Sequence, residues 1–103
     1  MKDLETLKAA VRRVARANGA RLALLFGSHA RGTATERSDV DLIFVEETSQ
    51  PFLDRLERYM GPLADELRTG VEAFVYTPEE FGRMKEGPFV QQALREGLVI
   101  HES

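Results

Sequence analysis

Apolar residues recur along the chain with two different periods, and these periods separate helices from strands. Near the N-terminus they return every three or four positions until Gly19, which predicts an amphipathic helix with a glycine stop. A second helical stripe runs from Leu53 to Leu67, where Gly61 and Pro62 predict a kink or a restart. Three short apolar runs predict strands: residues 21–26, 40–46 and 71–76.

Helix signals dominate the C-terminal quarter of the chain. Residues 77–80, Thr-Pro-Glu-Glu, form a capping box with proline at the first helical position and predict a short helix. Gly87-Pro88 begins another helix that ends near Glu96, and residues 98–101 predict a last strand. The resulting order, helix–strand–turn–strand–helix–strand–helix–helix–strand, predicts an α/β fold. We expect its helices mainly on one face of the sheet and its carboxylates on the other.

Composition limits the class of protein. A chain of 103 residues predicts one domain over residues 1–103. It has no cysteine, which excludes disulfides and thiolate metal sites. We expect a cytoplasmic protein without membrane contact, because no apolar run approaches the roughly 18 residues of a membrane span and no signal peptide is visible. A net charge of −3 argues against a general nucleic-acid binder.

The most informative chemistry is a pair of carboxylates at the start of the second predicted strand. Asp39 and Asp41 are one residue apart, so their side chains point to the same face of the strand. At about 6.6 Å of separation, the two charges repel each other by about 2.5 kcal/mol at an effective dielectric near 20. A divalent cation between them removes that cost, and Mg²⁺ prefers such oxygen ligands. A solvated strand edge is the alternative interpretation of the pair alone.

A small-residue turn ends the preceding predicted strand. Gly27 permits a tight turn and a close approach of backbone to ligand, and Ser28 offers a hydroxyl and an N–H. Ala30 and Arg31 suit the start of a short helix, where backbone N–H groups bind phosphate. Arg31 suits either a phosphate or an acidic neighbour. An ordinary strand–turn–helix corner is the alternative, and no Walker sequence follows.

Together these pieces resemble a known family. Gly-Ser-x-Ala-Arg-Gly over residues 27–32 and Ser-Asp-x-Asp-Leu over 38–42 are similar to the nucleotidyltransferase superfamily related to DNA polymerase beta. The likeness is strongest over residues 21–47. The chain length and its ending, from residue 89 to residue 101, resemble the minimal nucleotidyltransferases (MNT). The resemblance implies a nucleotidyltransferase fold with a small mixed sheet.

The resemblance also implies a third carboxylate on a later strand, and Glu72 is the candidate. The family usually has aspartate there, so this glutamate departs from the pattern and has one more methylene of reach. A strand-end glutamate that faces water is the alternative interpretation. On the family pattern, Asp39, Asp41 and Glu72 are the metal-binding and catalytic residues, and Gly27, Ser28 and Arg31 bind the nucleotide.

The implied reaction moves a nucleoside monophosphate, AMP from ATP, to an acceptor hydroxyl with the help of two Mg²⁺ ions. Because so small a domain has little room for an acceptor pocket, we expect a partner chain to supply it. Family members similar to this one are paired with HEPN-domain toxins and adenylylate a toxin tyrosine, which makes them antitoxins. Two alternatives stay open: transfer to a small-molecule hydroxyl such as an aminoglycoside with a helper subunit, and a non-catalytic binding antitoxin.

Overall fold

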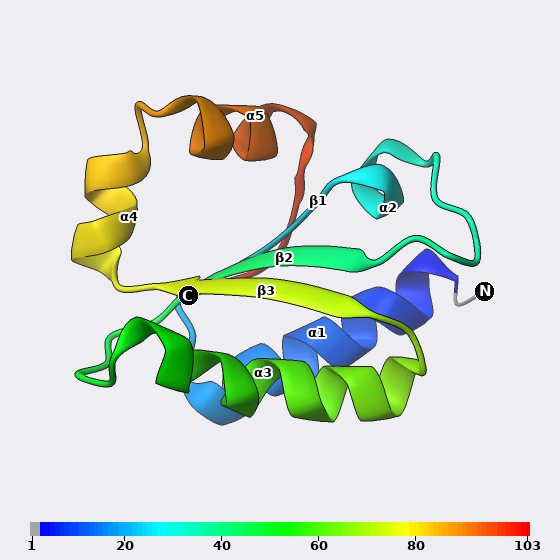
Figure 1. Cartoon of the computed structure of the whole chain (residues 1–103), viewed down its shortest axis with the longest axis horizontal. Helices are drawn as coiled ribbons and strands as arrows, with labels where there is room; N and C mark the ends of the chain where they lie inside the picture. The colour runs from blue at the N-terminus through cyan, green and yellow to red at the C-terminus, as the bar shows by residue number, and fades with distance from the viewer. Residues whose placement is uncertain (1–2) are drawn as a thin grey trace.

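The computed structural model describes residues 3–103, which form a four-stranded sheet with helices against both of its faces (Figure 1). The elements in chain order are α1 (Leu4–Asn18), β1 (Leu22–Phe26), α2 (Ser28–Arg31), β2 (Val40–Val45), α3 (Phe52–Leu67), β3 (Val71–Tyr76), α4 (Pro78–Met84), α5 (Pro88–Glu96) and β4 (Leu98–Glu102). The predicted order of elements is confirmed, and the predicted turn contains the short helix α2.

The sheet is mixed and its strand order is β3-β2-β1-β4. β1 lies antiparallel to β2 and to β4, whereas β2 and β3 are parallel and joined through α3. The register sets Phe26 opposite Asp41 and Asp41 opposite Glu72. One row across three strands therefore carries two of the acids singled out by the sequence.

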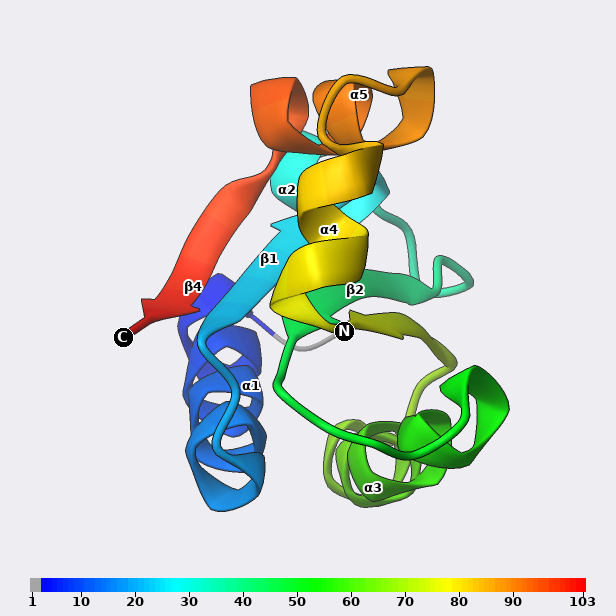
Figure 2. The ribbon, with the colours of Figure 1, turned by 90° about the vertical axis from the view of Figure 1, so that its left-hand side faces the viewer.

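Helices cover the two faces of the sheet unequally. The long helices α1 and α3 lie side by side under one face and enclose the larger apolar core (Figure 2). As predicted, the two longest helices share one face of the sheet. The shorter helices α4 and α5 lie over the other face, where Leu24, Ile43, Tyr76 and Ala93 form a smaller buried cluster. Face-alternating strands can bury both sides only when helices cover both.

The predicted helix ends are confirmed by their hydrogen bonds. Gly19 ends α1 in the left-handed conformation, with φ 71°, and its N–H bonds to the carbonyls of Ala15 and Arg16. The Thr77 side chain accepts the N–H of Glu80, and the Glu80 side chain accepts the N–H of Thr77. The capping box therefore begins α4 directly after β3.

Of the kink or restart predicted at Gly61-Pro62, the restart is wrong, because α3 continues through Pro62. Proline lacks the N–H that would bond to the carbonyl of Arg58, one turn earlier. Asn18 of α1 supplies the missing donor: its Nδ2 lies 3.3 Å from the Arg58 carbonyl oxygen. A contact between neighbouring helices thus satisfies the acceptor that the proline left open.

Two buried ionic groups hold the end of the sheet where β2 and β3 finish. Glu46, 4% exposed, accepts two hydrogen bonds from Arg58 and one from the hydroxyl of Tyr59. Arg55, 5% exposed, donates to both carboxylate oxygens of Glu80. These bidentate pairs join α3 to β2 and to α4 and satisfy the buried charges.

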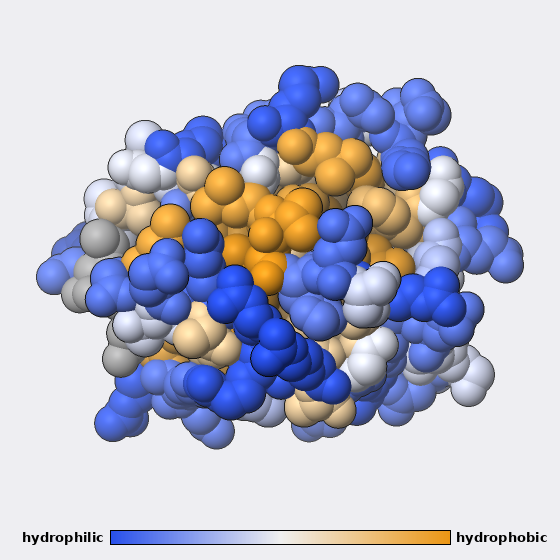
Figure 3. Space-filling model, turned by 180° about the vertical axis from the view of Figure 1, so that it is seen from behind, coloured by the Kyte–Doolittle hydropathy of each residue, from blue (hydrophilic) through white to orange (hydrophobic). Residues whose placement is uncertain are grey.

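Apolar side chains also reach the surface. Figure 3 shows an apolar patch on the side of the molecule where the edge strand β4 lies. Val99 of β4 is 54% exposed and Leu94 of α5 is 38% exposed. None of the helices within residues 3–103 has the length and apolar character needed to cross a bilayer.

Candidate active site

The three acids from the sequence lie at the end of the sheet opposite the buried ion pairs. Asp39 immediately precedes β2, Asp41 is the second residue of that strand, and Glu72 is the second residue of β3. Because Asp41 and Glu72 are register partners on parallel strands, their side chains leave the same face. Asp41 is half-buried, and Asp39 and Glu72 are exposed.

Two glycines make room for the two aspartates. A Cβ added to Gly27 would lie 2.3 Å from Asp41 Oδ2, and one added to Gly70 would lie 2.2 Å from Asp39 Oδ1. Neither distance is possible between real atoms without movement. Gly27 also has φ 76° and ψ −157°, a backbone region open essentially to glycine alone. Each carboxylate can therefore take its position only because the residue that faces it is a glycine, which has no Cβ.

The turn after β1 is a single helical turn. Gly27 precedes α2, and its carbonyl accepts the N–H groups of Ala30 and Arg31, each at 3.1 Å. The helix begins at Ser28, two residues earlier than Ala30, where the sequence placed it. Gly32 ends it with φ 80°. Ser28 therefore stands at the first helical position, directly after the glycine that lies against the carboxylate of Asp41.

A cleft of about 350 Å³ opens beside Asp41, between the β1–α2 turn and α5. Arg31 lies on its wall and donates to Glu96 of α5 over 2.9 Å. The acidic neighbour is thus the partner that Arg31 takes in this structure. The other lining residues, from β1, α2 and α5, are Phe26, Gly27, Ser28, Phe89, Gln92 and Ala93.

The surroundings of Asp41 shift the pKa of its carboxyl. Burial raises the pKa of its carboxyl above the ordinary value, and the nearby charges of Glu72 and Asp39 raise it further. His29 and Arg31 act in the opposite direction but do not outweigh them. His29 is half-buried, with Nε2 3.4 Å from the Ser38 carbonyl oxygen. The acids are close enough to influence one another, as expected of residues that share a cation.

Comparison with known proteins identifies the family. The model of the nucleotidyltransferase domain family matches residues 6–101, nearly the whole chain. The chain belongs to this nucleotidyltransferase family. A solved structure of a protein assigned as a minimal nucleotidyltransferase is 34% identical, with a TM-score of 0.68. The match covers 94% of this chain and 95% of that one. No curated protein matches the chain significantly.

Two further solved structures share the nucleotidyltransferase fold at lower identity. One is a toxin–antitoxin with AMP-PNP: identity is 22%, the TM-score is 0.71, and the match covers 93% of this chain and 73% of that one. The other contains a tri-AMPylated HEPN toxin from Shewanella oneidensis with its MNT antitoxin. There identity is 19%, the TM-score is 0.66, and the coverage is 96% and 72%.

The donor set of this nucleotidyltransferase can be tested against the metal that the family pattern implies. Within residues 3–103, no group of three His, Cys, Asp or Glu side chains is already gathered as a metal site. Asp39, Asp41 and Glu72 nevertheless supply only oxygen donors, at one sheet end, with mutual repulsion that a cation would relieve. In chemistry and placement the residues fit Mg²⁺, with Glu72 on an exposed part of its strand.

Some residues of this nucleotidyltransferase site were not singled out by the sequence analysis. Gly70, just before β3, adjoins Asp39. Phe89 and Glu96 face the cleft from α5, a helix far along the chain. Phe74 supports Phe89 through a ring contact, and the alternation along β3 was the available signal for it, because residues 72 and 74 share a face. Nothing in the sequence indicated that α5 would fold over that face.

Proposed function

We propose that this chain transfers AMP from ATP to a hydroxyl of a HEPN-type partner protein and thereby acts as its antitoxin. The proposal rests mainly on one observation. The turn at Gly27 and Ser28 and the carboxylate of Asp41 line one cleft, with Asp41 against Gly27, and Asp39 lies two residues before Asp41 at the same end of the sheet. A phosphate-binding turn next to a pair of acids is suited to a nucleoside triphosphate and its cations.

Each residue has a proposed role at a stated position. Asp39 and Asp41 would hold Mg²⁺, with Glu72 completing the set from β3. Bound Mg²⁺ supplies charge neutralisation on the phosphates and the leaving pyrophosphate. Ser28 contacts the outer phosphates from the start of α2, and Arg31 exchanges its bond to Glu96 for a phosphate oxygen.

The transfer itself is an in-line displacement at the α-phosphorus. The acceptor hydroxyl oxygen forms a bond to that phosphorus as the bond to the pyrophosphate oxygen breaks. The hydroxyl proton passes to a carboxylate of the site, and Glu72, exposed on β3, is the proposed acceptor. Positioning and electrostatic stabilisation account for most of the acceleration in such phosphoryl transfers.

The proposed partner follows from the fold relatives and from the surface. Two of the solved relatives are a toxin–antitoxin complex with AMP-PNP and an AMPylated HEPN toxin with its MNT antitoxin. Val99 and Leu94 are exposed apolar side chains, and the apolar patch in Figure 3 is a surface that a partner chain can bury. A partner-supplied hydroxyl also suits a domain whose cleft holds little beyond a nucleotide.

The test is to co-purify the chain with a candidate HEPN-domain partner, add Mg²⁺ and ATP, and weigh both chains. The expected result is a partner heavier by one or more AMP groups, with pyrophosphate released. Fragmentation should locate the added mass on a tyrosine. A stable complex that gains no mass would contradict transfer and favour an antitoxin that acts by contact alone. Transfer only to added small hydroxyl compounds would contradict the proposed acceptor.

A further inference from the structure

We propose that the part of the cleft under α5 is the nucleobase subsite, with Phe89 as its stacking surface and Gln92 as the side chain that reads a purine edge. This inference rests on the proposed function, because it assumes that the triphosphate lies at Ser28 and Asp41. It adds what the family assignment leaves open, namely where the base binds and what distinguishes adenine.

The cleft has two chemically different parts. Gly27, Ser28, Arg31 and Asp41 make one part polar and suited to phosphate and metal. Phe26, Phe89 and Ala93 make the other part apolar. A nucleotide has the same division, with an anionic chain at one end and a flat aromatic ring at the other. A volume of about 350 Å³ leaves room for a base and its sugar beside the phosphates.

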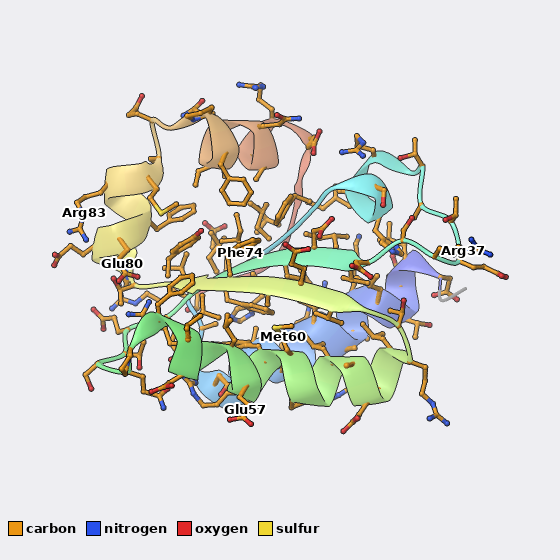
Figure 4. All side chains as sticks on the ribbon, in the orientation of Figure 1. Arg37, Glu57, Met60, Phe74, Glu80 and Arg83 are labelled. Atoms are coloured by element: carbon orange, nitrogen blue, oxygen red, sulfur yellow. The ribbon has the colours of Figure 1, made fainter. Side chains whose placement is uncertain are left out.

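The ring of Phe89 is supported from behind and open in front. It makes edge contacts with Phe26 and Phe74, with ring centroids 5.5 and 5.3 Å apart and interplanar angles of 87° and 68°. Figure 4 labels Phe74, which lies between β3 and the helices above it. Phe89 still leaves 41% of its surface exposed. A ring held by its neighbours and exposed to a cleft is suited to stack a base.

The face of α5 toward the cleft also carries the polar group that a base requires. Residues 89, 92, 93 and 96 follow the spacing of one helix face, and all four line the cleft. Within residues 3–103 the exposed amide of Gln92 has no hydrogen-bond partner, whereas Glu96 is bound to Arg31. A carboxamide offers one donor beside one acceptor, which matches the N6 amino group and the neighbouring ring nitrogen of adenine.

The first experiment compares ATP with inorganic tripolyphosphate, both with Mg²⁺, by titration calorimetry on the full chain alone. Phe89→Leu should weaken ATP binding by about 5-fold to about 150-fold, the range expected for loss of one stacked base. Tripolyphosphate has no base, so its affinity should stay within about twofold. Phe52→Leu is the matched control, because Phe52 is 37% exposed but lies at the start of α3.

A second experiment detects stacking without relying on affinity. The fluorescence of 2-aminopurine riboside triphosphate should be quenched on binding to the parent chain and to Phe52→Leu. At saturation it should be much less quenched by Phe89→Leu.

A third experiment tests Gln92. The parent should prefer ATP over purine riboside triphosphate, which lacks the N6 amino group, by about 2-fold to 10-fold. Gln92→Ala should lose that preference, and Gln91→Ala, on the same helix, should keep it.

The outcomes separate this inference from the proposed function. If tripolyphosphate binds the parent but Phe89→Leu weakens both ligands equally, or neither, the base does not lie against Phe89. Unchanged quenching in that variant would leave the ring free for another group, such as the acceptor side chain of the partner. If neither ATP nor tripolyphosphate binds the parent, the phosphate site and the proposed function fail together.

Discussion

The two ends of the sheet use acidic residues in opposite ways. At one end, Glu46 and Glu80 are each bound by an arginine from α3, and the buried charges are satisfied. At the other end, no salt bridge within the described residues joins Asp39, Asp41 or Glu72 to a cation, and Arg31, whose charge acts on Asp41, is bound to Glu96. Arg58 and Tyr59 lower the pKa of Glu46 despite its burial, whereas burial and neighbouring acids raise that of Asp41.

The acids at the first end therefore stabilise the fold, whereas the acids at the second end are suited to binding a cation. A paired acid gains free energy from folding, because its cation is already in place. A charged acid whose pKa is raised by burial and by other acids, such as Asp41, makes folding less favourable, and a bound cation offsets that cost. The contrast is therefore evidence for function that does not depend on the family match. It can be tested by disturbing each end in turn.

The largest effect is expected from Asp41→Asn. It should lower AMP transfer by about 10³-fold or more, because a metal ligand contributes several kcal/mol to the transition state. The same change should raise the melting temperature of the metal-free chain, since it removes a repelled charge. Radiolabel transfer and calorimetry measure the two effects. Glu57→Gln, exposed on α3 (Figure 4), should change neither. Full activity in Asp41→Asn would refute the metal assignment.

At the opposite end, Arg55→Met should destabilise the chain without affecting nucleotide binding. Removing one partner of a buried pair leaves the other uncompensated and costs about 3 kcal/mol or more. Urea denaturation measures this cost. Arg83→Met is the control, because Arg83 pairs with Glu79 on an exposed helix face and such pairs contribute about 0–1 kcal/mol. Equal losses in the two variants would remove the distinction drawn between the ends.

The dependence of Asp41 on Gly27 predicts a smaller, local effect. Gly27→Ala should weaken Mg²⁺-dependent ATP binding by about tenfold or more, because the new Cβ displaces the Asp41 carboxylate. Gly32→Ala shares the strain of a positive φ, about 1–2 kcal/mol, but its Cβ would meet nothing within 4 Å. Both variants should lose stability, and only the first should lose affinity. Similar affinities would mean that the turn is structural alone.

The smallest effect is a difference in pH dependence. Hydrogen bonds from Arg55 and from the Thr77 backbone lower the pKa of Glu80 to about 2, so its stabilisation is present above its ordinary pKa of 4.5. That stabilisation is lost as the pH falls toward 2. The raised pKa of Asp41 has the opposite sign, so its charge destabilises the metal-free fold above pH 3.8. Melting temperatures of Glu80→Gln and Asp41→Asn between pH 2 and pH 7 should therefore diverge from the parent in opposite directions.

Local signals allowed much of the fold to be predicted from the sequence. Gly19, the capping box at Thr77 and Gly87-Pro88 each act within one helical turn, so element order and most boundaries followed from neighbouring residues. The restart at Pro62 was predicted wrongly because the donor that compensates for the proline, Asn18, lies on another helix. Helix propensity describes a segment alone, and tertiary contacts can override it.

The candidate site, like the fold, was predictable where neighbouring residues determine it and not where tertiary packing does. The alternation of side chains along a strand was enough to place Asp39 and Asp41 on one face, the strand-end turn indicated Gly27 and Ser28, and the resemblance added Glu72. The contribution of α5 was not predictable, because its position depends on packing over the second face of the sheet. Arg31 was given two options, and only the structure shows it bound to Glu96. The roles of these residues in catalysis stay predictions.

The proline in α3 has a consequence for how this sequence can change over time. Pro62 leaves the Arg58 carbonyl without its helical donor, and the Asn18 side chain on α1 donates to that carbonyl instead. Asn18 also accepts a hydrogen bond from the Arg58 side chain. Loss of Asn18 is then harmful while Pro62 is present and milder once position 62 regains an N–H. The order of the two replacements therefore matters: an ancestral chain could acquire the proline safely only after the asparagine, so positions 18 and 62 should vary together among relatives.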